Sequence, residues 1–232
     1  MKRFWRQVSV EPEATGWSIR LDGRAVRTPA RAPLAVPNDS LAEAIANEWC
    51  DVADEIDPRA MPLTGLANAA IDRVAPDRQA FAAGLARYAE ADLACYRADN
   101  PEVLVERQAT SWDALLSWAR RRFDVDFVTT SGVRHVAQPA ATVERLAHAV
   151  AALDAFRLAG LSPLVTIGGS LIAGLAVLEK AVTADDAWQA VSLDERWQLE
   201  QWGSDAEAEA ALANRNRDFI TAARFLELVG DA

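Results

Sequence analysis

The chain has 232 residues, of which 51% are hydrophobic and 25% are charged, so it can bury a full apolar core and is expected to fold. Its 34 acidic and 24 basic side chains give a formal net charge of -10, which repels phosphate backbones and excludes nucleic acid as an expected partner. Cys50 and Cys95 lack metal-ligand spacing, and the N-terminal stretch lacks the apolar region of a secretion signal, so two buried free thiols and a cytoplasmic location are expected.

The first 37 residues alternate apolar and polar side chains, a pattern typical of β-strands. Within "WSIRLDGRAVRT", Asp22 and Gly23 separate two alternating runs, which is the strongest short-range signal for a hairpin. Ser40, followed three residues later by Glu43, predicts the cap of a first helix. We therefore predict an α+β fold, with a small antiparallel β domain over residues 1–38 and a larger all-helical domain over residues 39–232.

The first predicted helix carries Trp49 on the same face as Leu41, Ile45 and Val52. A tryptophan on such an apolar face packs the helix against its neighbours. We predict a structural role for Trp49.

The segment "LAGLSPLVTIGGSLIAGLAVL", residues 158–178, carries no charge and is long enough to cross a bilayer. Its four glycines, its proline and its lack of flanking basic or aromatic anchors favour a buried helix instead. We predict a central helix over residues 162–180 and no membrane insertion.

Candidate catalytic and metal-binding groups are sparse. His135 and His148 have no Glu or Cys spaced to complete a metal site, and the Gly168-Gly169 pair lacks the lysine of a phosphate loop. Ser170 does not stand in the G-x-S-x-G motif of a hydrolase. We expect no catalytic residue, metal, cofactor or small-molecule substrate, although a pair of helix-borne carboxylates stays open as an alternative.

The stretch "SLDERWQLEQWGSDAEAE", residues 192–209, spans the end of one helix and the start of another. Trp202-Gly203 predicts a helix end, with a structural role for Gly203, and Ser204 with Glu207 predicts the next cap. We expect the last two helices to form an antiparallel pair.

Glu195 stands out because helical spacing places it at the centre of an apolar stripe. The other members of the stripe lie within about 40° of it and are Trp188, Val191, Leu199 and Trp202. Glu200 falls on the far side. A carboxylate in such a stripe forms an internal ion pair, anchors a docking partner or acts as a catalytic acid, and spacing favours the internal ion pair.

These residues also carry a family resemblance. "LDERWQLEQWG" resembles the pattern Leu-x-Glu-x-aromatic-Gln-x-x-x-Trp-Gly of the ATP-twelve family, the assembly chaperones for the alpha subunit of the F-type ATP synthase head. The stretches "IDPRAMPLTGLANAAIDRV" and "DLACYRADNPEVLVERQATSWDALLSWARRRFDV" and the pair Glu48-Trp49 are similar to further landmarks of that family, in the same order, from about residue 4 to residue 225.

The resemblance implies a non-enzymatic chaperone that binds the unassembled alpha subunit until the beta subunit displaces it. The glutamate of the family motif matches Glu195, so Glu195, with Leu199 and Trp202 of the same stripe, is the predicted partner-binding site. An adaptor of the same fold with another client is the first alternative, and an enzyme is the second. The missing targeting extension suggests a bacterial member of the family.

Overall fold

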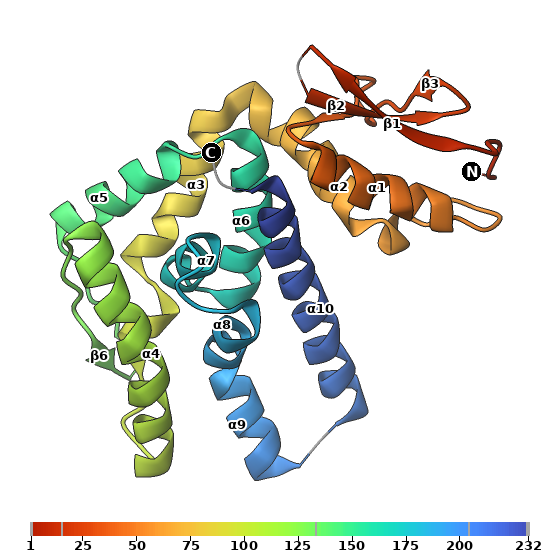
Figure 1. Ribbon diagram of the computed structural model, residues 1–232. Helices are drawn as coiled ribbons and strands as arrows, with labels where there is room; N and C mark the ends of the chain where they lie inside the picture. The colour runs from red at the N-terminus through yellow and green to blue at the C-terminus, as the bar shows by residue number, and fades with distance from the viewer. Residues whose placement is uncertain (1, 15, 133, 204, 231–232) are drawn as a thin grey trace. The chain divides into compact units, whose positions relative to one another are not determined.

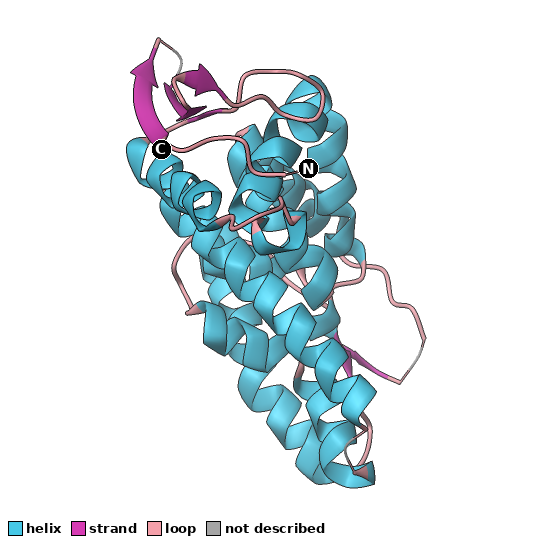
Figure 2. Ribbon diagram, turned by 90° about the vertical axis from the view of Figure 1, so that its right-hand side faces the viewer, coloured by secondary structure: helices cyan, strands magenta, loops and turns pink. Residues whose placement is uncertain are grey.

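The computed structural model describes residues 2–14, 16–132, 134–203 and 205–230. Its contacts group the chain into two compact units, residues 1–78, 154–160 and 224–232 in the first and residues 79–153 and 161–223 in the second. Figure 2 shows that helices make up most of the chain and that the main sheet is small. The predicted α+β class, a small antiparallel sheet followed by a mainly helical region, is confirmed.

The sheet of the first unit has four short strands, β1 (Val8–Glu13), β2 (Gly16–Leu21), β3 (Arg24–Ala25) and β4 (Ala35–Val36). Strands β1 to β3 lie in sequence order, β4 also pairs with β2, and all pairings are antiparallel. Asp22 and Gly23 have φ angles of 48° and 78°, the conformation of a tight hairpin turn. The predicted hairpin is therefore confirmed.

Helix α1 (Asp39–Asp51) follows the sheet. Its cap is Asn38, whose Oδ1 accepts a hydrogen bond from the Leu41 backbone N–H at 2.9 Å, so the predicted cap at Ser40 is wrong by two residues. The Asn38 side-chain NH₂ group also donates to the carbonyls of Leu228 and Val229. An asparagine side chain can make both kinds of contact because its amide has an acceptor oxygen and a donor nitrogen. The change from strand to helix lies at the predicted residue 38, whereas the first compact unit extends beyond it to residue 78.

Helix α2 (Pro62–Ala69) and the short helical turns around it complete this segment, namely η1 (Pro58–Ala60), η2 (Ala70–Val74) and η3 (Ala75–Asp77). Met61, at the cap position of α2, offers no side-chain hydrogen bond. The Glu48 carboxylate of α1 instead accepts from the N–H groups of Leu63 at 2.7 Å and Thr64 at 2.8 Å. One helix thus caps the next.

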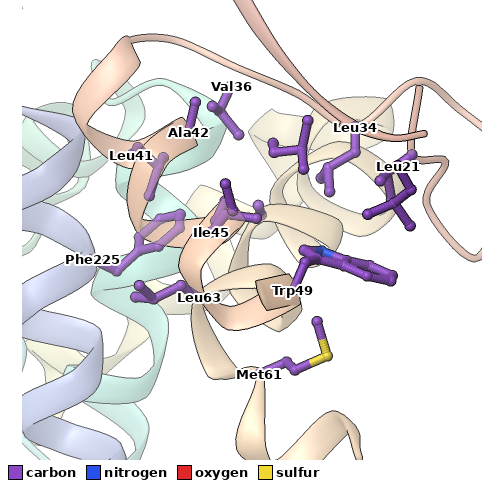
Figure 3. Packing of buried hydrophobic residues seen from close by; sticks show 14 of the residues in the cluster. Leu21, Leu34, Val36, Leu41, Ala42, Ile45, Trp49, Met61, Leu63 and Phe225 are labelled. Carbon is purple, nitrogen blue, oxygen red and sulfur yellow. The ribbon is translucent and has the colours of Figure 1, made fainter. Parts of the chain in front are cut away.

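The core of the first unit lies between the sheet, α1, α2 and the end of α10. Figure 3 shows Ile45 and Trp49 of α1 among Leu21, Leu34 and Met61. Trp49 is 8% exposed, and its ring packs edge-on against Trp5 at a centroid distance of 5.3 Å. This packing is what a structural role requires.

The second unit consists mainly of helices (Figure 1). In chain order its elements are α3 (Arg78–Ala86), η4 (Arg87–Glu90), η5 (Leu93–Cys95), β5 (Tyr96–Arg97), α4 (Glu102–Phe123), β6 (Thr130–Ser131), α5 (Ala140–Ala151), α6 (Ala155–Gly168), α7 (Leu171–Leu178), α8 (Ala184–Val191), α9 (Leu193–Trp202) and α10 (Ala206–Val229). Strands β5 and β6 form a two-residue parallel pair that was not predicted. Helices α3, α6 and α10 contribute residues to both units.

The uncharged segment is buried, as predicted, but it is not one helix. Gly169 has a φ of 65°, and the Ser170 hydroxyl caps a new helix, α7, by accepting from the Ala173 N–H at 3.0 Å. Among the described residues, the structure contains no helix whose length and apolar character would allow it to cross a membrane.

Both cysteines are free. Cys95 is buried as predicted, and burial raises the pKa of its thiol to about 12. The predicted burial of Cys50 is wrong, because this residue follows Trp49 and a helix turns by about 100° per residue, which directs its side chain to solvent.

Candidate partner-binding site

Helices α8 and α9 are separate, so the predicted continuous stripe around Glu195 is wrong. The break lies at Ser192, whose hydroxyl donates to the Trp188 carbonyl at 2.6 Å. Trp188 is buried, with its ring 5.6 Å from that of Phe219, whereas Trp202 at the far end of α9 is 79% exposed. Trp188 therefore packs in the core, whereas the Trp202 side chain lies in solvent.

Glu195 forms an ion pair with Arg215 of α10. The two carboxylate oxygens accept from Nη1 at 2.8 Å and Nη2 at 2.6 Å, a two-pronged geometry that fixes both side chains. The side chains of Glu195 and Arg215 are nevertheless 45% and 42% exposed. Spacing favoured an ion pair within the chain, and Arg215 provides its cation. The pair is not buried, because both side chains remain partly exposed to solvent.

A groove of about 400 Å³ lies beside this ion pair, between α9 and α10. Figure 1 shows that the two helices run in opposite directions, as predicted. Leu199 and Trp202 line the groove from α9, and Ala208, Ala211 and Leu212 line it from α10. The three predicted partner-binding residues, Glu195, Leu199 and Trp202, therefore lie together on one groove.

Gly203 ends α9 at the edge of this groove. Its φ of 85° is a conformation that other residues rarely adopt, and its N–H donates to the Leu199 carbonyl at 3.1 Å. The Asp205 carboxylate accepts from the Glu207 N–H at 3.1 Å, next to the start of α10 at Ala206. Ser204, the predicted cap, lies outside the described residues.

The opposite side of α9 is held by α4. Glu200 accepts from Arg107 at 2.7 Å, and the Arg107 guanidinium lies 4.8 Å from the centre of the Trp197 ring. Gln108, which is buried, donates to Asp194 at 2.7 Å. These contacts confirm that Glu200 and Glu195 lie on different sides of α9, and they fix the side that faces away from the groove.

Arg215, Arg107 and Gln108 were not identified from the sequence. A signal for Arg215 was present, because the face of α10 that bears Leu212, Phe219, Ala222 and Leu226 at helical spacing also bears Arg215. No comparable pattern identifies Arg107 or Gln108, whose partners lie more than 80 positions away in the chain.

The groove supplies contact surface and one ion pair. Across the described ranges, no group of three or more His, Cys, Asp or Glu side chains is placed to hold a metal ion. An exposed tryptophan beside an apolar groove is typical of a surface that binds another protein. The groove therefore has the features of a surface that contacts another protein.

The chain belongs to the ATP12 chaperone family, because the family model described as ATP12 chaperone protein matches residues 2–120. It is similar to the crystal structure of Atp12 from Paracoccus denitrificans, with 45% identity, coverage of 98% of each chain and a TM-score of 0.94. The Atu1473 protein of Agrobacterium tumefaciens is 38% identical over 97% of this chain and 85% of that one, with a TM-score of 0.92.

A more distant relative is the mitochondrial protein atp12 of Schizosaccharomyces pombe, 24% identical over 216 residues, which are 88% of this chain and 74% of the yeast protein. The family is one of chaperones, and chaperones of this kind are not enzymes. The alternative of catalytic carboxylates on helices is therefore discarded.

Proposed function

We propose that this chaperone assists ATP synthase assembly by binding the unassembled alpha subunit of the F-type head until the beta subunit displaces it. Membership of the ATP12 family supports this proposal. The relatives from Paracoccus denitrificans and Agrobacterium tumefaciens support a bacterial protein, which we propose acts in the cytoplasm.

The observation that carries the proposal is the groove of α9 and α10 with the exposed Trp202 at its rim. An unassembled subunit exposes apolar interface surface that water drives toward aggregation. The Trp202 ring and Leu199 offer such surface an apolar contact, and the half-exposed Glu195 carboxylate offers a cation or amide donor a polar one. A small groove of this kind gives moderate affinity, which permits displacement by a larger native interface.

The first test is capture of the purified alpha subunit by the tagged chaperone. Trp202→Ala removes an exposed ring without disturbing the core, so it is expected to weaken capture by about tenfold or more and leave the melting temperature unchanged. A variant that captures as well as the parent would contradict the role of the groove.

Exchanging the charges of Glu195 and Arg215 distinguishes direct contact of Glu195 with the client from a positioning role of the ion pair. Glu195→Lys loses both the carboxylate and the Arg215 contact, whereas the double variant Glu195→Arg with Arg215→Glu restores an ion pair in the opposite orientation. Direct contact with the client predicts that capture stays weak in the double variant although the ion pair is restored. Recovery of capture in the double variant would assign Glu195 to positioning. Glu200→Lys, which breaks the Arg107 ion pair on the other side of α9, is the matched control.

The alternative of an adaptor with another client is tested by also isolating the tagged chaperone from a cell extract. The parent chain would then fail to capture the alpha subunit, and a different protein would co-purify in a manner sensitive to Trp202→Ala.

A further inference from the structure

Charge is unevenly distributed along this acidic chain. Residues 1–36 hold only three acidic side chains, Glu11, Glu13 and Asp22, and seven basic ones, which are Lys2, Arg3, Arg6, Arg20, Arg24, Arg27 and Arg31. The sheet and its flanking turns therefore carry a positive charge, although the whole protein has a formal net charge of -10. A local field of this sign attracts acidic groups.

A recess of about 320 Å³ opens on this basic part of the first unit. Leu21, Val26 and Trp49, each at least nine-tenths buried, form its apolar wall, and Phe4 stands beside them with 64% of its surface exposed. Figure 3 shows Leu21 and Trp49 on neighbouring sides of the same cluster. The recess thus offers a space in which one apolar side chain of a partner can be buried.

Two arginines, Arg24 and Arg27, also line the recess, and both are exposed. Neither forms a salt bridge with a carboxylate of the described residues. Arg27 donates one hydrogen bond to the Arg31 carbonyl at 2.8 Å, which leaves further donors of its guanidinium for a partner. The buried Nε1–H of Trp49, in the same wall, has no hydrogen-bond acceptor within the described part of the chain.

We propose that this recess is a second docking surface, which binds an acidic segment of a partner protein through one apolar side chain and its neighbouring carboxylates. The apolar side chain enters between Phe4 and the wall of Leu21, Val26 and Trp49, and the carboxylates pair with Arg24 and Arg27. This combination fits a peptide segment better than a lipid surface, because Phe4 is the single large apolar side chain of the recess lining that is exposed, whereas Leu21, Val26 and Trp49 form a hollow.

The surface shares no lining residue with the groove of α9 and α10. The proposal therefore does not depend on the identity of the client that binds the groove, and its test needs no ATP synthase subunit.

The test uses two amidated five-residue peptides, Glu-Asp-Phe-Asp-Glu and its charge-reversed form Lys-Lys-Phe-Lys-Lys. Each is titrated into the full ¹⁵N-labelled protein while the indole N–H signals are followed by NMR, with Trp49 assigned by its absence in Trp49→Phe. The acidic peptide is expected to shift the Trp49 signal in a saturable manner, and the basic peptide is expected to leave it in place.

The matched variants are Arg24→Glu with Arg27→Glu, and Arg59→Glu with Arg73→Glu, two exposed arginines of the same unit that do not line the recess. Both pairs change the net charge equally. The first pair is expected to weaken binding of the acidic peptide by about tenfold or more, and the second pair to weaken it much less. Both double variants are expected to keep the melting temperature of the parent.

Three results would overturn the proposal: equal shifts with both peptides, no saturable shift of Trp49 with the acidic one, or equal losses in the two double variants. Sedimentation with vesicles of phosphatidylglycerol and phosphatidylcholine provides the remaining comparison. Vesicle binding that needs Arg24 and Arg27, without peptide binding, would identify an anionic membrane as the ligand and would also refute the proposal.

Discussion

The buried carboxylate of Asp92 accepts a hydrogen bond from the Ser170 hydroxyl at 2.7 Å, where α6 ends and α7 begins. It also accepts from the N–H groups of Ile172 at 3.0 Å and Ala94 at 3.1 Å. Burial is the largest influence on this group and raises the pKa of Asp92 from 3.8 to about 6, against the opposing effect of these hydrogen bonds.

Asp92 should therefore make stability depend on pH. Between pH 3.8 and about 6 the folded state keeps the proton while the unfolded state releases it, so the free energy of unfolding falls as pH rises through this window. The loss from this group is about 3 kcal/mol and is complete above about pH 6. Asp92→Asn removes it, so the variant should gain about 3 kcal/mol relative to the parent from about pH 4 to about pH 7 in urea denaturation. A difference in the free energy of unfolding between Asp92→Asn and the parent that stays constant with pH would refute this prediction.

Trp49→Arg should destabilise the first unit strongly. The substitution places a charge without a partner among Leu21, Ile45 and Met61, at an expected cost of about 3 kcal/mol or more. Thermal melting measures the effect, with Cys50→Arg as the control, because Cys50 is exposed on the same helix. Equal melting temperatures for the two variants would contradict the structural role of Trp49.

Two glycines of the hairpin region should differ in their tolerance of alanine. A Cβ atom on Gly16, which has a φ of 132°, would lie 2.3 Å from the Val36 carbonyl oxygen, whereas one on Gly23 meets no atom within 4 Å. Gly23→Ala is expected to cost about 1 to 2 kcal/mol for its φ of 78° alone, and Gly16→Ala more than about 3 kcal/mol. Chemical denaturation measures both losses, and a larger loss for Gly23→Ala than for Gly16→Ala would contradict this expectation.

The Glu195–Arg215 ion pair should contribute little to stability. Both side chains are close to half exposed, and solvent screening limits such pairs to about 1 kcal/mol or less. A double-mutant cycle with Glu195→Ala and Arg215→Ala measures the coupling directly. A coupling well above 2 kcal/mol would mean that the ion pair is a structural element of the α9–α10 pair.

Local patterns predicted the elements well. Asp22-Gly23 identified the hairpin because both residues tolerate a positive φ. The cap of α1 was misplaced because Ser40 with Glu43 matched a capping box, whereas Asn38, itself a favoured cap residue, has Leu41 at the third position after it. The contacts of Asn38 with Leu228 and Val229, nearly two hundred positions away, leave no local pattern.

Spacing grouped the residues that line the candidate groove, but it gave neither their partners nor the break before α9. Glu195, Leu199 and Trp202 share α9, so their spacing placed them together. The break at Ser192 was missed because serine interrupts a helix only weakly by itself, and here its hydroxyl bonds back to the preceding turn. The partner of Glu195 depended on how α10 packs, so the choice between ion pair and docking anchor could not be made from spacing.

The capping of α2 by Glu48 has a consequence for the order of folding. A helix of eight residues is too short to nucleate well by itself, and α2 begins without a side-chain cap of its own. Its first N–H groups find their acceptor only when the last turns of α1 have formed and α1 has come alongside. Helices α1 and α2 should therefore form and open as one cooperative unit, in which the amide protons of Leu63 and Thr64 exchange no more slowly than α1 itself unfolds.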